Sequence, residues 1–257
     1  MNHAKIKCLL PVIILLVCLA IPTVITGCGG VSARAKEILN NSNKSMEAIK
    51  TTRMHFDMDT KAMGESLSIT MVLDQVVDSP EGMKLRAVME IKGQEMEMYM
   101  VGGMSYIYAE GEWYKTSEPL TKRLTAGFGS IEELQEAMPY AEEAKVIKED
   151  KDSYKIFFRL GNKYFKKKIQ ESEEQGSATI YIENLGSYDS IIGDCTYTIS
   201  KKTNYVTAAD FALSLNSWQS GNSKTKGETT LEYNLPIDIQ LPPEALNAPT
   251  MPNSETP

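Results

Sequence analysis

Four successive stretches between residues 54 and 100 alternate apolar and polar side chains with a period of two. Successive side chains of an extended strand point to opposite faces, so this period predicts strands with one apolar face and one polar face. The apolar positions are Met54, Phe56, Met58, Leu67, Ile69, Met71, Leu73, Leu85, Ala87, Met89, Ile91, Met96, Met98 and Met100. An antiparallel sheet that covers a core on one side is typical of this pattern.

A two-residue turn at Lys92-Gly93 fixes the expected register of two of these strands. The turn places Met89 opposite Met96 and Leu85 opposite Met100, so that the apolar side chains fall on one face. A slip of one residue would bring glutamate side chains to that face, which makes the alternative register costly. The sequence therefore predicts a hairpin with a methionine-rich apolar face.

More strands follow along the chain. A second turn at Gly102-Gly103 predicts a strand from Met104 to Ala109, with Ile107 on the apolar face. Hairpin turns are expected at Asn204 and over residues 220–226, where small polar residues gather. The remaining strands are expected at 144–149, 154–160, 178–183, 196–202, 206–215 and 228–235.

Three helices are expected between the strands. An apolar stripe with a period of 3.6 residues predicts an amphipathic helix over residues 33–50, with Ser32 as its N-cap. A capping box predicts a short helix over residues 130–138. A basic helix is expected over residues 162–170, where four lysines could touch anionic lipid head groups or could form a solvated face balanced by the acidic residues that follow.

The N-terminus has the layout of a secretory signal. Two lysines precede an apolar run from Leu9 to Val24, and Ile25-Thr26-Gly27-Cys28 follows it. This tetrapeptide resembles a bacterial lipobox. The resemblance implies cleavage between Gly27 and Cys28 and attachment of a diacylglyceryl group to the Cys28 thiol. An uncleaved transmembrane anchor or an ordinary secretory signal is the alternative.

The expected organisation therefore has four parts. Residues 1–27 are a signal peptide, and residues 28–32 are a lipidated N-terminus with a very short tether. Residues 33–246 form one β-rich domain, and residues 247–257, rich in Pro and Asn, form a disordered tail. The expected location is the extracytoplasmic face of a bacterial cell membrane, with the lipid as the membrane contact.

Composition narrows the range of partners. The chain has 27 basic and 34 acidic residues, and loss of the two lysines of residues 1–27 leaves a formal charge of −9. An acidic body argues against nucleic acid and against a broad polybasic membrane contact. No protein partner can be named from the sequence.

The sequence offers little for catalysis. Only Cys195 remains after Cys28 is lipidated, and its strand-like surroundings favour a buried, inert thiol. His55, Asp57 and Asp59 fall on one strand face, but their spacing is wide for one metal ion, so a solvated polar face is preferred. No nucleophile, phosphate-loop or zinc motif is present, so neither an enzyme, a metal nor a cofactor is expected.

The layout as a whole resembles the LolA/LppX-like group of bacterial lipoprotein-type proteins. The shared pattern is one N-terminal amphipathic helix, a long antiparallel meander with two-residue hairpins, a helix inserted in mid-chain and further strands, the last of which ends in Tyr233–Pro242. The resemblance implies an α+β fold that is mainly antiparallel β. It further implies a curved, incomplete β-barrel with a few helices over its concave face, which enclose an apolar cavity.

The same resemblance suggests a role in binding or transferring a lipid or acyl chain without catalysis. Flexible, polarizable methionines suit a wall that adapts to varied acyl chains. The expected cavity residues are Met54, Phe56, Met58, Leu67, Ile69, Met71, Leu85, Met89, Met96, Met98, Met100 and Ile107. The alternative is that these side chains pack under the first helix, in an interaction or envelope-sensing module that has no ligand.

Overall fold

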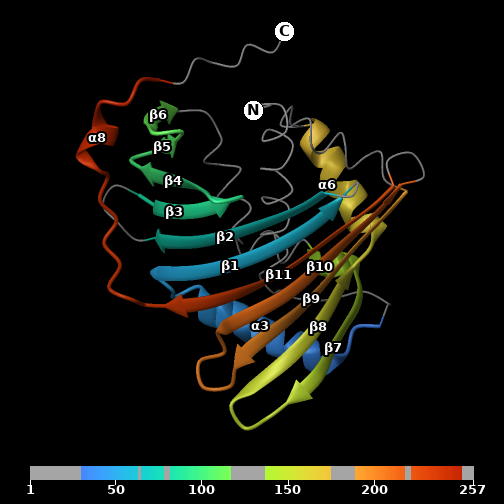
Figure 1. Ribbon diagram of the computed structural model, residues 1–257. Coiled ribbons are helices and arrows are strands. Elements are labelled where there is room, and N and C mark those ends of the chain that lie inside the picture. Colours follow the sequence, from blue (N-terminus) through green and yellow to red (C-terminus); the bar gives the residue numbers. More distant parts are fainter. Residues whose placement is uncertain are drawn as a thin grey trace.

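One antiparallel sheet organises the chain in the computed structural model (Figure 1). The structure describes residues 30–62, 65–77, 82–116, 137–174, 189–217 and 221–250. Within these residues, eleven strands lie in the order β6-β5-β4-β3-β2-β1-β11-β10-β9-β8-β7. Two meanders, β1 to β6 and β7 to β11, are therefore joined where β1 pairs with β11.

The strands are β1 Thr51–Ala62, β2 Glu65–Val76, β3 Lys84–Ile91, β4 Gln94–Val101, β5 Met104–Ala109, β6 Glu112–Thr116, β7 Ala141–Glu149, β8 Ser153–Leu160, β9 Ser190–Ser200, β10 Val206–Ser217 and β11 Gly221–Tyr233. The helical elements are α3 Ala33–Met46, the 3-10 turn Met138–Tyr140, α6 Asn162–Glu174 and α8 Pro243–Leu246. The sheet curves but does not close, because β6 and β7 remain at its two ends (Figure 1). The α+β class and the open, curved half-barrel are thus confirmed.

The expected register of the β3–β4 hairpin is confirmed. Met89 lies opposite Met96 and Leu85 lies opposite Met100. Lys92 and Gly93 form the turn, and both have positive φ angles, as a tight hairpin turn of this kind requires. The alternation of side chains therefore puts Leu85, Ala87, Met89, Met96, Met98 and Met100 on one face, which we call the concave face.

Helix α3 packs its apolar side against the β7–β11 half of the concave face (Figure 1). Ser32 caps it as expected, since its Oγ accepts a hydrogen bond from the Ala35 backbone N–H at 3.1 Å. The helix ends at Met46, four residues before the expected end, and strand β1 begins at Thr51. The β-branched pair Thr51-Thr52 favours this change to extended chain.

Both ends of the sheet pair with segments near the chain termini. At β7, Ala144 accepts a hydrogen bond from the Ser32 N–H at 2.8 Å, and Val31 and Ala144 form a parallel bridge. At β6, the Lys115 N–H donates to the Pro249 carbonyl at 3.0 Å, and Lys115 bridges Thr250. The sequence assigns residues 247–250 to the tail, but in the structure they lie against β6. These pairings cover edge strands that would otherwise expose free backbone groups.

Two expectations about strands need correction, and one strand was not expected. Residues 221–226 are not a turn but the first half of β11, because Ser223 and Thr225 are small enough to face the interior. Strand β9 begins at Ser190 rather than at residue 196. Strand β6 was not anticipated. The expected helix over residues 130–138 falls, apart from its last two residues, outside the described residues, and the expected strand over residues 178–183 lies wholly outside them.

Candidate functional site

The twelve expected cavity residues all lie on the concave face of β1 to β5. Eleven of them are buried, and Met96 is partly buried and packs against the same apolar cluster. The pairing brings Phe56, Met71, Met89 and Met96 into one row that crosses four strands. The sequence therefore predicted correctly that these side chains share one apolar face.

The sequence pattern did not assign the β7–β11 half of the apolar face to the candidate site. Ile156 and Phe158 on β8, Tyr197 on β9, and Phe211 and Leu213 on β10 belong to the same cluster. Their period of two was visible in the sequence, but only the resemblance to a half-barrel could have indicated that two separate meanders share one face. The candidate site therefore extends over both meanders.

A glycine joins the two halves of this face. The Phe211 ring stacks on the Phe56 ring across β11, with centroids 5.5 Å apart and planes 12° apart. The intervening residue is Gly227, where an added Cβ would lie 2.2 Å from a Phe211 ring atom. Only a residue without a side chain leaves room for this stack, which closes the apolar surface over the seam between the meanders.

A few uncharged polar groups interrupt the concave face. Thr60 and Thr225 share a hydrogen bond of 2.9 Å between their hydroxyls. The Ser105 and Thr229 hydroxyls are buried without a partner. On α3, the Asn43 amide and the Asn40 side-chain oxygen are likewise buried without a partner.

The opposite, convex face carries the charges. Arg53 donates two hydrogen bonds to Asp74, at 2.7 and 2.9 Å, and Arg159 donates two to Asp194, at 2.6 and 2.7 Å. The hydrogen bond from each guanidinium to its carboxylate raises the pKa of the arginine. These cross-strand pairs fix neighbouring strands from outside and leave the inner face apolar.

His55 lies on this convex face, with Nε2 3.9 Å from a Glu232 carboxylate oxygen. Asp59, two positions beyond Asp57, accepts a hydrogen bond from Ser68 instead of turning toward the histidine. Among the described residues, no group of three or more His, Cys, Asp or Glu side chains is placed to hold a metal ion.

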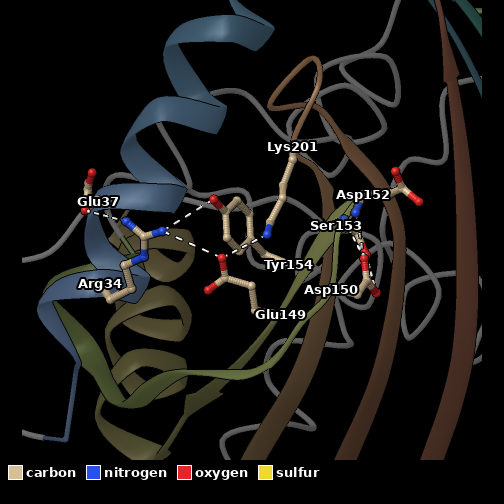
Figure 2. Close-up of polar contacts among 8 residues, drawn as sticks. All are labelled: Arg34, Glu37, Glu149, Asp150, Asp152, Ser153, Tyr154 and Lys201. Atoms are coloured by element: carbon tan, nitrogen blue, oxygen red, sulfur yellow. Dashed lines mark hydrogen bonds and ion pairs between the residues drawn. The ribbon is translucent and has the colours of Figure 1, made fainter.

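A polar cluster fastens the beginning of α3 to the strands (Figure 2). The Glu149 carboxylate accepts a hydrogen bond from Lys201 Nζ at 2.8 Å and lies 3.9 Å from Arg34 Nη2. Arg34 also donates to Glu37 at 3.2 Å and to the Tyr154 hydroxyl at 3.4 Å, and Lys201 Nζ lies 4.6 Å from the Tyr154 ring centroid. The hydrogen bond from Lys201 lowers the pKa of Glu149. This cluster holds the helix at the edge of the concave face.

Three of the four lysines of α6, namely Lys163, Lys167 and Lys168, have partners within the protein. Lys163 Nζ and Lys167 Nζ lie 5.5 and 5.2 Å from the Tyr140 ring centroid. Lys167 and Lys168 form ion pairs with Glu171 at 2.7 and 3.3 Å. This arrangement favours the balanced, solvated helix face over a dedicated head-group site.

Cys195 is buried, as expected. Its surroundings raise the pKa of the thiol to about 12, chiefly because burial disfavours the thiolate. Gly27 and Cys28 lie outside the described residues. No described helix is both long enough and apolar enough to cross a membrane.

Three solved structures are similar to this chain at low identity. A DUF1329 family protein from Desulfovibrio piger has 10% identity and a TM-score of 0.32, and the match covers 76% of this chain and 90% of that one. A putative outer membrane lipoprotein-sorting protein domain from Vibrio parahaemolyticus has 10% identity and a TM-score of 0.29, with 79% and 93% covered. A LolA superfamily protein from Nitrosomonas europaea has 9% identity and a TM-score of 0.30, with 80% and 94% covered.

None of the curated proteins matches the sequence. The sheet order of this chain itself shows the half-barrel. The three solved structures are similar to the chain but do not indicate its function. A family model described as a family of unknown function, DUF6612, matches residues 34–250. Since that match spans most of the chain, the protein belongs to the DUF6612 family.

Proposed function

We propose that this protein is a membrane-anchored surface lipoprotein that binds or transfers a hydrophobic ligand, a lipid or an acyl chain, without catalysis. One observation carries the proposal: a continuous apolar face runs across both meanders of an open, curved sheet. Helix α3 contacts the sheet chiefly at β7, and helix α6 contacts it chiefly at β8 and β9. The main contacts of both helices are therefore away from the methionine-rich strands β2 to β5.

The energetics of such binding follow from apolar burial. Each Å² of acyl surface removed from water contributes about 25 cal/mol. Methionine side chains adapt their shape at little cost, which suits chains of varied length and saturation. The proposed ligand therefore lies along the row that includes Met71, Met89 and Met96.

The proposed anchor is Cys28, at the extracytoplasmic face of a bacterial cell membrane. Gly30 lies only two residues further on, and Ala144 of β7 donates its N–H to the Gly30 carbonyl at 3.4 Å. Two residues of extended chain reach about 7 Å. A lipidated Cys28 would therefore keep the β7 edge near the bilayer, which favours a fixed receptor over a shuttle that leaves the membrane.

Replacing Cys28 by Ser tests the anchor. The protein should move from the membrane fraction to the soluble extracytoplasmic fraction, because no lipid can be attached to serine. Cys18→Ser, within the apolar run, serves as the matched control and should leave the protein in the membrane. A Cys28→Ser protein that stays in the membrane would show that an uncleaved apolar segment holds it.

A matched pair of variants tests the site. Met71 faces the concave side and its neighbour Val72 faces the convex side. Binding of the neutral apolar dye N-phenyl-1-naphthylamine to the Cys28→Ser protein should weaken several-fold in Met71→Gln and should be unchanged in Val72→Gln. Equal effects of the two changes would contradict binding on the concave face.

A second candidate function is an interaction or envelope-sensing module with a packed interior. The observation in its favour is the burial of eleven of the twelve expected cavity residues within one cluster. A filled core of this kind would take up neither the dye nor a lipid.

A further inference from the structure

The buried side of α3 changes character along the helix. Ala35, Ile38 and Leu39 are apolar and belong to the core cluster. Asn43 follows Leu39 by four residues, so it lies one turn further on the same side. It is only 3% exposed. An asparagine thus occupies a position where the helical pattern calls for an apolar residue.

Neither end of the Asn43 amide has a hydrogen-bond partner, and the oxygen of Asn40, three residues earlier on the same helix, has none either. Buried amide atoms without partners destabilise a protein, since they have lost water and gained nothing. Native proteins pair nearly all such groups. The unpaired Asn43 amide and the unpaired Asn40 oxygen therefore indicate a place where a polar group from outside the chain is to be bound.

The concave face of the sheet also buries uncharged polar groups that have no partner. Thr229 and Ser105 each bury an unpaired hydroxyl on the concave face, opposite Phe56 and Met100 respectively. In the part of the chain that the structure describes, no Lys, Arg, Asp or Glu is buried on that face, and the one buried carboxylate, Asp74, is paired with Arg53 on the convex side. A charged head group would find no counter-ion here, which makes its burial costly.

We propose that Asn43, assisted by Asn40, binds the polar end of a neutral acyl lipid that carries both a hydroxyl and an ester carbonyl, that is, an acylglycerol. The Asn43 amide nitrogen would donate to the ester carbonyl, and the two asparagine oxygens would accept from glycerol hydroxyls. The acyl chain would then lie on the apolar sheet. This inference rests on the proposed function and names the ligand class of the same face.

Competition against N-phenyl-1-naphthylamine on the Cys28→Ser protein tests the inference with three ligands of equal chain length. We expect 1-monooleoylglycerol to bind at least tenfold more tightly than methyl oleate, which lacks hydroxyls, and more tightly than oleate, which is charged. Asn43→Leu should remove the preference for the glyceride and retain methyl oleate binding. Asn41→Leu, at an exposed position of the same helix, is the matched control and should keep the preference.

Two results would overturn the inference while leaving the proposed function intact. One is equal binding of monooleoylglycerol and methyl oleate by the unchanged protein. The other is a preference that survives both Asn43→Leu and Asn40→Leu. If none of the three ligands displaces the dye or binds, the proposed function fails and this inference fails with it.

Thermal unfolding supplies a readout that does not depend on ligand. Asn43→Leu removes two unpaired buried polar atoms, so its melting temperature should equal or exceed that of the unchanged protein. A clear fall in melting temperature in both Asn43→Leu and Asn40→Leu would mean that the amides support the fold, and would overturn their assignment to a ligand.

Discussion

Gly227 is the residue on which the continuity of the apolar face depends most. Because Gly227 has a hydrogen in place of a side chain, the Phe211 ring can reach the Phe56 ring across β11. An added methyl group would also lie 2.5 Å from the Asp57 carbonyl oxygen, which is backbone and cannot rotate away. The stack and the β1–β11 pairing would both have to shift.

We therefore predict that Gly227→Ala lowers the free energy of unfolding by about 2–3 kcal/mol, as overpacking of a close contact does. Urea denaturation measures it. Gly103→Ala is the control, since a Cβ there meets nothing within 4 Å and only its positive φ angle is strained. A Gly227→Ala protein no less stable than Gly103→Ala would contradict the account of the seam.

Cys195 makes stability depend on pH in the alkaline range. Its pKa is raised from about 9 to about 12 by burial. Below pH 9 the thiol is protonated in both the folded and the unfolded protein. Between pH 9 and pH 12 the thiol loses its proton only in the unfolded protein. The folded state is therefore progressively disfavoured as the pH rises.

The free energy of unfolding should therefore fall more steeply between pH 9 and pH 11 in the unchanged protein than in Cys195→Ala, by up to about 1.4 kcal/mol per pH unit. Tyr233, whose pKa burial also raises, is present in both proteins and cancels in the comparison. Identical slopes would mean that the thiol is accessible to solvent in the folded state.

At the scale of elements, the termini act as covers for the two edges of the sheet. Lys115 of β6 pairs with Pro249 and Thr250, and Ala144 of β7 pairs with Gly30 and Ser32. An uncovered edge strand offers its free backbone groups to a second molecule. The short chain segments outside the sheet therefore shield both of its edges from pairing with a second molecule.

Truncation after Asn247 should expose β6 and increase self-association, measured by size-exclusion chromatography with light scattering. Truncation after Thr250 keeps both contacts of Lys115 and is the matched control, expected to behave like the full chain. Equal behaviour of the two truncated proteins would show that the edge needs no cover.

Local pattern predicted the elements well where side chains alternate cleanly. Strands β1 to β5 of the first meander and the turn at Lys92-Gly93 were foreseen for this reason. The start of β9 was missed because Gly193 and Asp194 are poor strand formers, yet Asp194 pairs with Arg159 of β8. Propensity was overridden there by a partner distant in sequence, which no local pattern reveals.

The polar first half of β11 was missed for a similar reason. Ser223 and Thr225 look like turn residues, but both face the interior, and Thr225 bonds with Thr60 of β1. Likewise, the pairing of β1 with β11, which makes one face from two meanders, depends on contacts across most of the chain. Thus the first half of the candidate site could be predicted residue by residue, and the second half could not.

For the whole molecule, the two faces of the sheet have opposite characters. The convex face carries paired charges, such as Arg53 with Asp74, and the concave face carries apolar side chains with a few uncharged polar groups. A curved sheet with this division can enclose hydrophobic material on one side and face water on the other. We propose that the concave side encloses a lipid in this way.

Mass spectrometry of an organic extract of the purified Cys28→Ser protein tests this proposal, because that variant carries no covalent lipid of its own. The account predicts an acyl lipid in the extract at close to one molecule per protein, and less of it in Met71→Gln than in Val72→Gln. An extract without lipid, from a protein that also fails to take up N-phenyl-1-naphthylamine, would contradict the account and favour the packed interaction module.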